Sequence, residues 1–187
     1  YSLRCSITSQ LVFDDCRIPD ANRLPGTTGL RNALACLNQA RFGIAWGALG
    51  SGMATFESAL DYAASRLQFR ERPIASHQMV QAKLVTMFDG LLKGQLLAHR
   101  LADLKEAGRL RHEAVSLGKR NNVAVARECA RLAREIHGAN GIANEYPIMR
   151  HLMNMETVVT YEGTEDIHTL VLGTYLTGEP AFNPPER

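Results

Sequence analysis

The stretch that decides the fold covers residues 76–107 and reads SHQMVQAKLVTMFDGLLKGQLLAHRLADLKEA. Apolar and small residues recur in it at alternating spacings of four and three, namely Val80, Leu84, Met87, Leu91, Gly94, Ala98 and Leu101. A repeat of that period places one continuous apolar stripe along a helix. The sequence therefore predicts a long helix that packs against another helix along most of its length.

The following stretch, residues 111–137, carries a matching stripe. It recurs at spacings of three and four through Val115, Gly118, Asn122, Val125, Cys129, Leu132 and Ile136. Two long helices joined by a short connection pack side by side as an antiparallel pair. We expect the chain to be mainly α, with an antiparallel helical bundle as its core.

Residues on the C-terminal side predict two shorter helices. Gly138 suits the end of the long helix, and Asn140-Gly141 suits a tight turn. A helix is expected over residues 147–158, with a loop at 160–163 after it. Thr164 can cap a last helix that runs to residue 176. The tail, residues 180–187, contains three prolines and is expected to be extended.

The N-terminal part has a different pattern. Residues 6–13, SITSQLVF, are rich in β-branched and apolar residues and predict one or two strands. Two strands alone are marginal in water, so they need a larger sheet to join. Pro25-Gly26 marks a boundary, which gives a strand-and-linker segment at 1–26 and a helical bundle domain with its tail at 27–187.

The first helix, expected from residue 30 onward, is interrupted by Gly43, Gly47, Gly50 and Gly52. Each glycine costs roughly 0.5–1 kcal/mol against alanine in a helix. We expect compensation from the close approach of another backbone or a ligand, with plain packing as an equal alternative.

Composition excludes several classes of function. Lysine and arginine number 21 and aspartate and glutamate 19, a net charge of +2 with no basic block, so nucleic acid is not expected as a partner. No apolar run approaches the ~20 residues of a membrane span. The four cysteines are scattered and the six histidines lack metal-ligand spacing, so we expect free thiols and no metal. Because Tyr1 begins the chain, either a piece of a longer protein or a processed start is possible.

Three groups of residues could carry chemistry. Glu162 lies among apolar residues and beside Gly163, and a poorly solvated carboxylate becomes a usable base near neutral pH. Most loop glutamates are simply solvated, so that alternative stays open. The turn at 137–141 could offer backbone N–H groups to a phosphate, or it could be only a helix cap. Arg66 close to Phe69, and Arg41 among small residues, could each meet a phosphate or form a surface ion pair.

Together these signals resemble the acyl-CoA dehydrogenase family. The residues that carry the resemblance are YEGT at 161–164 before a helix, the turn at 137–141, and Arg66-x-x-Phe69 with Gln78 after it. CLNQARFGIAWG at 36–47, YEGTEDIH at 161–168 and LTG at 176–178 look most like the glutaryl-CoA dehydrogenase branch. The opening strands look like the end of that family's central β-domain. One departure is the loop Arg70-Glu71-Arg72-Pro73, where the family has glycine and one residue fewer.

The resemblance implies a set of site residues. Glu162 matches the catalytic base, and Tyr161 and Gly163 flank it. Positions that line the CoA and acyl channel are matched by Leu37, Asn38 and Arg41. Positions that contact FAD, several of them across a subunit interface, are matched by Arg66, Phe69, Gln78, Glu135, His137, Gly138, Ala139, Gly141, Thr164, Asp166 and Phe182.

The implied function is FAD-dependent α,β-dehydrogenation of an acyl-CoA thioester, with glutaryl-CoA as substrate and decarboxylation to crotonyl-CoA. The implied partners are an electron-transfer flavoprotein and further copies of the chain in a dimer of dimers. The implied location is the cytoplasm of a bacterium or the mitochondrial matrix. Two alternatives remain: a helical assembly module without activity, and a dehydrogenase or oxidase for another acyl substrate.

Overall fold

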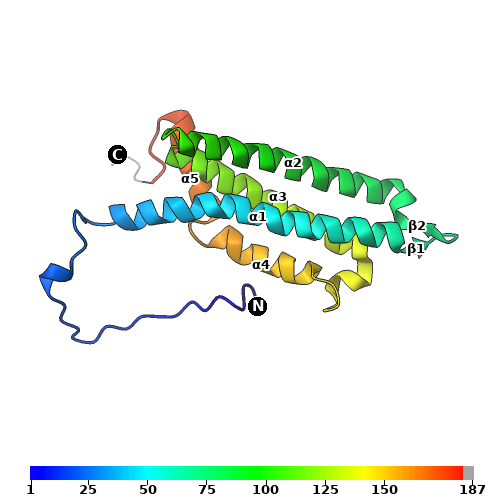
Figure 1. Ribbon diagram of the computed structural model, residues 1–187, viewed down its shortest axis with the longest axis horizontal. Coiled ribbons are helices and arrows are strands. Elements are labelled where there is room, and N and C mark those ends of the chain that lie inside the picture. The colour runs from blue at the N-terminus through cyan, green and yellow to red at the C-terminus, as the bar shows by residue number, and fades with distance from the viewer. Residues whose placement is uncertain (183–187) are drawn as a thin grey trace.

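The computed structural model describes residues 1–182 and confirms the mainly α fold (Figure 1). Its α-helices are α1 Arg31–Ser65, α2 Gln78–Glu106, α3 His112–His137, α4 Ile148–Thr160 and α5 Glu165–Thr177. Short 3-10 helices lie at η1 Asp20–Asn22, η2 Ile74–Ser76 and η3 Gly138–Ile142, and a two-stranded antiparallel hairpin joins β1 Leu67–Gln68 to β2 Arg72–Pro73. Helices α2 to α5 lie within two residues of the ranges that the sequence predicts, and α1 begins one residue after its predicted start.

Helix α3 forms the centre of the bundle, and its predicted stripe faces α1 and α2. The stripe residues Val115, Asn122 and Cys129 are buried, as is the matching α2 stripe from Met87 to Leu101. Asn122 is the polar member, and its amide donates to Ala45 O of α1 at 2.8 Å and to Gly94 O of α2 at 3.2 Å. Satisfied in this way, a buried amide fixes the register of three helices without a desolvation penalty.

Glycines allow the three long helices to approach closely. A Cβ at Gly94 would lie 2.7 Å from Leu49 Cδ2, and one at Gly118 would lie 2.3 Å from Leu101 Cδ1. Gly52 fits the close approach of another helix that we expect at the α1 glycines, since a Cβ added there would lie 2.8 Å from Leu91 Cδ2 of α2. The other three α1 glycines, Gly43, Gly47 and Gly50, face open space, so nothing in the described chain offsets their helical cost.

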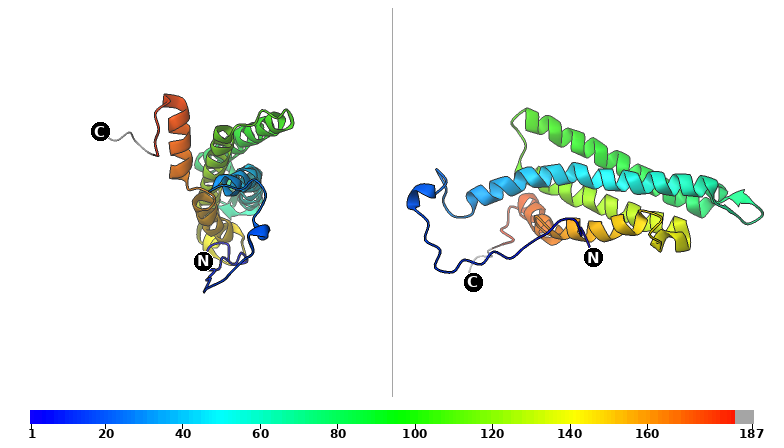
Figure 2. Two further views of the ribbon diagram at one scale, coloured as in Figure 1. Left: turned by 90° about the vertical axis from the view of Figure 1, so that its left-hand side faces the viewer. Right: turned by 60° about the horizontal axis from the view of Figure 1, so that its bottom comes forward.

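A second buried stripe on α3 was not predicted. Ser116, Lys119, Val123, Ala126 and Ala130 are buried on the face turned toward α4 and α5. The left view of Figure 2 shows α5 projecting across the bundle rather than along it. Helix α3 is therefore covered on both sides, and Lys119 is enclosed near the α4–α5 connection.

The expected N-terminal strands are not formed. Residues 7–13 have no strand partner within residues 1–182, and Ile7, Leu11, Val12 and Phe13 are exposed. The right view of Figure 2 shows this segment running outside the bundle. A strand requires a neighbour to bond with, and the described chain supplies none. Only the first residues dock, where Leu3 N donates to Asn154 Oδ1 of α4 at 2.8 Å.

None of the helices in the described range is long and apolar enough to cross a membrane. Most of the extended tail expected at 180–187 lies outside the described residues.

Candidate functional site

The connection between α4 and α5, residues 161–164, has an unusual backbone. Glu162 has φ 54° and Gly163 has φ 91°, both in the left-handed region that non-glycine residues avoid. Thr164 ends the turn as the N-cap of α5, its hydroxyl accepting from Ile167 N at 3.2 Å. That cap confirms the sequence prediction. A strained glutamate persists only where its surroundings hold it in place.

Two cations hold this loop through its carbonyl groups. Arg41 Nε of α1 donates to Glu162 O at 2.7 Å, and Lys119 Nζ of α3 donates to both Tyr161 O and Gly163 O at 2.5 Å. All three successive carbonyls therefore point toward positive charge. Charge-assisted hydrogen bonds are about twice as strong as neutral ones, so the loop is fixed despite its strain.

The polar groups on the other side of this loop lack partners. Glu162 Oε2 is buried with no hydrogen-bond partner, and among residues 1–182 the Glu162 N–H also has no acceptor. A buried oxygen without a partner is rare in a folded protein. A backbone donor and a carboxylate oxygen on one residue are thus both without a partner in the described chain.

His168 of α5 lies beneath the loop and is 1% exposed. Neither ring nitrogen has a hydrogen-bond partner. Burial, followed by the charges of Lys119 and Arg41, lowers the pKa of His168 to about 4. A Cβ at Gly163 would lie 3.1 Å from His168 Nε2 and 3.3 Å from Arg41 Nη2. Glycine is therefore required at this position by contacts inside the chain as well as by φ.

Lys119 is the most deeply buried cation near the loop, at 1% exposed. Burial and the charge of Arg41 lower its pKa to about 8, while Glu162 acts in the opposite direction. The Tyr161 ring lies 5.8 Å from Nζ. Sequence reasoning missed both Lys119 and His168. For Lys119 the reason is that a lysine between glycine and arginine on a helix normally faces solvent.

A second group of predicted residues meets at the hairpin end of the bundle. Arg66, Phe69, Gln78, Glu135 and Gly138 line one cavity of about 660 Å³. The structure therefore brings together residues that are separated by up to 72 positions in the sequence. It also adds Lys83 and His77, which the sequence analysis did not single out.

This cavity has groups that suit a phosphorylated aromatic ligand. Among the described residues Arg66 has no ion-pair partner, whereas Glu135 is paired with Lys83 at 2.8 Å and with Arg131. The Lys83 hydrogen bond is the largest effect that lowers the pKa of Glu135. His77 Nε2 is buried without a partner, and its ring meets the exposed Phe69 ring edge-on at 5.3 Å. An unpaired guanidinium and an open aromatic face can hold a phosphate and a base.

The hairpin beside the cavity contains a further strained segment. Phe69, Arg70 and Glu71 all have positive φ, at 49°, 71° and 55°. The hairpin turn therefore has left-handed backbone at three successive non-glycine positions.

The remaining predicted residues have varied positions. Asn38 accepts from Arg41 Nη1 at 3.2 Å, and Leu37 lies beside it half-buried on α1. His137 is buried, stacked on Tyr62 with ring centroids 4.4 Å apart. Ala139 is exposed, whereas a Cβ at Gly141 would lie 2.5 Å from Arg134 O. Asp166 and Phe182 are exposed.

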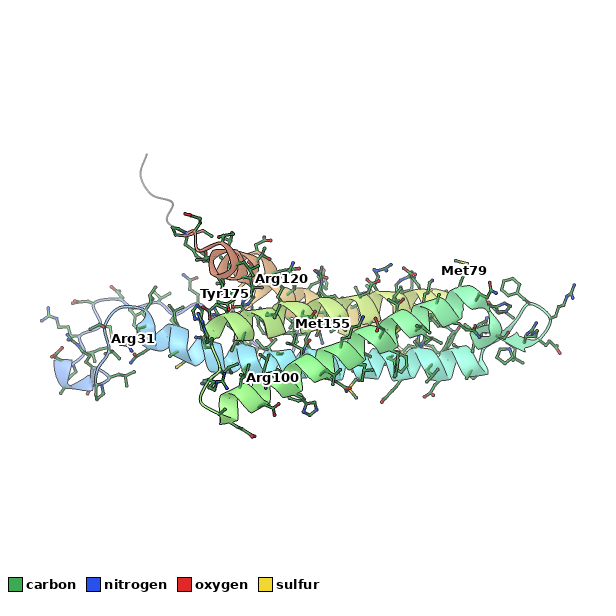
Figure 3. The ribbon with its side chains drawn as sticks, turned by 90° about the horizontal axis from the view of Figure 1, so that it is seen from above. Arg31, Met79, Arg100, Arg120, Met155 and Tyr175 are labelled. Atoms are coloured by element: carbon green, nitrogen blue, oxygen red, sulfur yellow. The ribbon has the colours of Figure 1, made fainter. Side chains whose placement is uncertain are left out.

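The two groups lie at opposite ends of the bundle. Arg41 and Arg66 are both on α1 or its C-cap, and a rise of ~1.5 Å per helical residue separates them by roughly 35–40 Å. In Figure 3, Met79 lies near the hairpin and Tyr175 of α5 lies toward the other end of the bundle. A single dinucleotide cannot reach both groups of one chain.

Comparison with known proteins shows the family of the chain. Residues 27–176 match the family model described as acyl-CoA dehydrogenase, C-terminal domain. An acyl-CoA dehydrogenase of Bacillus subtilis is 37% identical over 92% of this chain and 46% of its own length.

Two solved structures are also similar. A glutaryl-CoA dehydrogenase from Mycobacterium smegmatis has a TM-score of 0.95 and 55% identity over 97% of this chain and 47% of its own. A glutaryl-CoA dehydrogenase from the same organism in complex with FADH2 has a TM-score of 0.89 and 45% identity over 92% of this chain and 44% of its own. The chain spans about half the length of these relatives. The chain belongs to the acyl-CoA dehydrogenase family, and its helical bundle is the C-terminal domain of that family.

Proposed function

We propose that the protein catalyses FAD-dependent α,β-dehydrogenation of an acyl-CoA thioester, with Glu162 as the base. The observation that carries this proposal is the Glu162 side chain itself. Its Oε2 is buried without a partner in a loop whose backbone is held by Arg41 and Lys119. A fixed carboxylate with an unused oxygen is suited to accept a proton from a ligand.

The residues of the loop would divide the work. The Glu162 carboxylate removes the α-proton of the thioester, and negative charge develops on the thioester oxygen. The Glu162 N–H, which lacks an acceptor in the described residues, donates to that oxygen and stabilises the charge. Bound FAD supplies the acceptor for the β-hydride. Leu37 and Asn38, one turn before Arg41 on α1, would line the approach to the loop, while Arg41 holds the loop through Glu162 O.

FAD binding is supported by the cavity at the hairpin end. Arg66, with Gln78 and the Gly138 backbone, would hold the pyrophosphate, and Phe69 with the unpaired His77 nitrogen would meet the adenosine. The neighbour solved with FADH2 is consistent with this assignment. Because the cavity and Glu162 are so far apart in one chain, the cofactor that reaches Glu162 would use the cavity of a second subunit.

Assembly of several copies is therefore part of the proposal. Exposed apolar residues Val85, Phe88, Leu92 and Leu96 recur at spacings of three and four on the face of α2 turned away from the bundle. An apolar stripe of this kind marks an interaction surface. We propose that it contributes to a dimer of dimers. A monomer in light scattering at micromolar concentration would count against cofactor sharing.

For the substrate we propose glutaryl-CoA, oxidised and decarboxylated to crotonyl-CoA, with an electron-transfer flavoprotein as acceptor. The support is the 55% identity with a glutaryl-CoA dehydrogenase against 37% with the acyl-CoA dehydrogenase of Bacillus subtilis. The location proposed is the cytoplasm of a bacterium or the mitochondrial matrix. Release of carbon dioxide with crotonyl-CoA tests the substrate, and rapid reaction of the reduced protein with air would instead indicate an oxidase.

The base is tested with Glu162→Gln in the complete gene product loaded with FAD. Flavin reduction by excess acyl-CoA under anaerobic conditions should slow at least the ~10²–10⁴-fold typical of general-base catalysis. FAD content and acyl-CoA binding should stay unchanged, because the amide keeps the shape of the side chain. Near-normal flavin reduction in the variant would exclude Glu162. A colourless wild-type protein that takes up no FAD would favour the assembly-module alternative.

A further inference from the structure

We propose that Lys119 is a positioning residue for the oxyanion donor, because it bonds the carbonyl of the peptide unit whose N–H belongs to Glu162. This inference rests on the proposed function. It adds a role for a buried side chain on α3 that would touch neither substrate nor cofactor.

The geometry of the peptide unit makes the connection direct. The carbonyl of Tyr161 and the N–H of Glu162 belong to one planar trans peptide and point in opposite directions. Lys119 Nζ occupies the carbonyl side of this unit at 2.5 Å. The Glu162 N–H must therefore point away from Lys119, to the side where the described chain offers it no acceptor.

The charge of Lys119 also strengthens this donor. A cation on a carbonyl polarises the whole amide, and hydrogen bonds in such chains reinforce one another. Lys119 bonds Gly163 O as well, and Arg41 bonds Glu162 O, so each carbonyl of the turn is drawn to the protein side. The arrangement exposes backbone N–H groups on one side of a strained turn and keeps the cations on the other.

A purely structural role explains less well why a lysine is used. Lys119 is 1% exposed, and enclosing an ammonium group costs free energy unless its hydrogen bonds compensate. A neutral side-chain amide could donate to both carbonyls, although its hydrogen bonds would hold the strained loop less firmly. The full charge has a second use where the peptide stabilises negative charge on its far side.

The readout is the infrared stretch of the thioester carbonyl in an enoyl-CoA bound to the oxidised FAD-loaded gene product. The enoyl-CoA undergoes no oxidation, so the frequency reports polarisation of the carbonyl alone. In wild type the band should lie below its frequency in water. Lys119→Met should lose most of this downshift, and its rate of flavin reduction should fall about 10- to 100-fold with little change in KM.

Two further variants separate this inference from the proposed function. Glu162→Gln keeps the backbone N–H, so it should retain the downshift while losing flavin reduction. Lys93→Met, which removes an exposed lysine paired with Asp89 on α2, should change neither. A full downshift in Lys119→Met would overturn the role of Lys119 and leave the base assignment intact. Normal flavin reduction in Glu162→Gln would overturn the base assignment.

A pH series gives the same test without relying on the folding of Lys119→Met. The charged or titratable groups around Lys119 are Arg41, Arg120, Tyr161, Glu162, Glu165 and His168. His168, with a pKa of about 4, is neutral above pH 7, and the pKa of Tyr161 is raised above 10. The pKa of Lys119 is about 8 with Glu162 present, and the charge of Glu162 raises it, so in the Glu162→Gln background the downshift should diminish with a midpoint below pH 8 as Lys119 loses its proton. A carbonyl frequency that stays constant from pH 6 to pH 9 would contradict the proposed role.

Discussion

Replacing Gly163 with alanine should damage the loop by two separable effects. The first is backbone strain, because an L-residue at φ 91° lies outside its allowed regions. The second is contact, because the new methyl group would lie 3.1 Å from His168 Nε2 and 3.3 Å from Arg41 Nη2. His168 is buried and has little room to withdraw.

The matched control is Gly178→Ala. Gly178 has φ 76° and open space around its Cβ direction, so this substitution introduces strain without contact. Strain of about 1–2 kcal/mol, offset by the ~0.5–1 kcal/mol entropic cost of glycine, leaves Gly178→Ala destabilised by up to roughly 1.5 kcal/mol. Gly163→Ala should lose about 1–3 kcal/mol more, the usual cost of overpacking a filled site.

Thermal unfolding of the 187-residue chain measures the difference. A loss of 1 kcal/mol lowers Tm by roughly 2–4 °C for a domain of this size, so Gly163→Ala should unfold roughly 2–12 °C below Gly178→Ala. In the FAD-loaded gene product Gly163→Ala should also slow flavin reduction, because a displacement near 1 Å can cost about 10²-fold. Equal Tm values for the two variants would refute the close contact with His168 and Arg41.

Three further predictions concern stability. Gly141→Ala should lower the free energy of unfolding by about 1–3 kcal/mol, because the new Cβ would lie 2.5 Å from the backbone oxygen of Arg134, which cannot move aside. An unchanged Tm in thermal unfolding would show that η3 is loosely packed. Arg70→Gly should stabilise the chain by about 0.5–1 kcal/mol by relieving positive φ, and a lower denaturation midpoint would contradict this. His168 binds its proton with a pKa of about 4 when folded and about 6.5 when unfolded, so the free energy of unfolding should fall by up to roughly 3 kcal/mol from pH 6.5 to pH 4. His168→Leu should remove that part of the pH dependence of the unfolding free energy, measured by denaturant titrations at several pH values. An unchanged pH dependence would assign it to other groups.

The helical stripes were predictable because packing there follows the period of the helix. Met87, Leu91 and Leu101 are buried as the spacing indicates. Thr164 begins α5 through its side-chain cap, and Gly138 ends α3 with a positive φ that glycine adopts readily. The N-terminal strands were predicted from composition alone. Composition can indicate a strand but cannot supply the neighbour that a strand requires.

The supporting residues of the candidate site could not be predicted in the same way. Lys119 forms hydrogen bonds with carbonyls 42 and 44 positions away, and a carbonyl has no signature in the side-chain sequence. His168 is buried because α5 turns across α3, and the turn depends on the strained backbone at Glu162. Resemblance to the family pointed to Glu162 and Arg41, whereas Lys119 and the hydrogen bond of Arg41 to Glu162 O became apparent only in three dimensions.

The most direct test of Glu162 as the base is proton exchange separated from oxidation. An acyl-CoA with an α-methylene group and a quaternary β-carbon, such as 3,3-dimethylbutyryl-CoA, can lose an α-proton but cannot be dehydrogenated. When this acyl-CoA is incubated in D2O with the FAD-loaded gene product, its α-protons should exchange for deuterium, and NMR measures the rate. Glu162→Gln should slow the exchange at least ~10²-fold. Equal exchange rates in the wild type and the variant would contradict the assignment of Glu162 as the base.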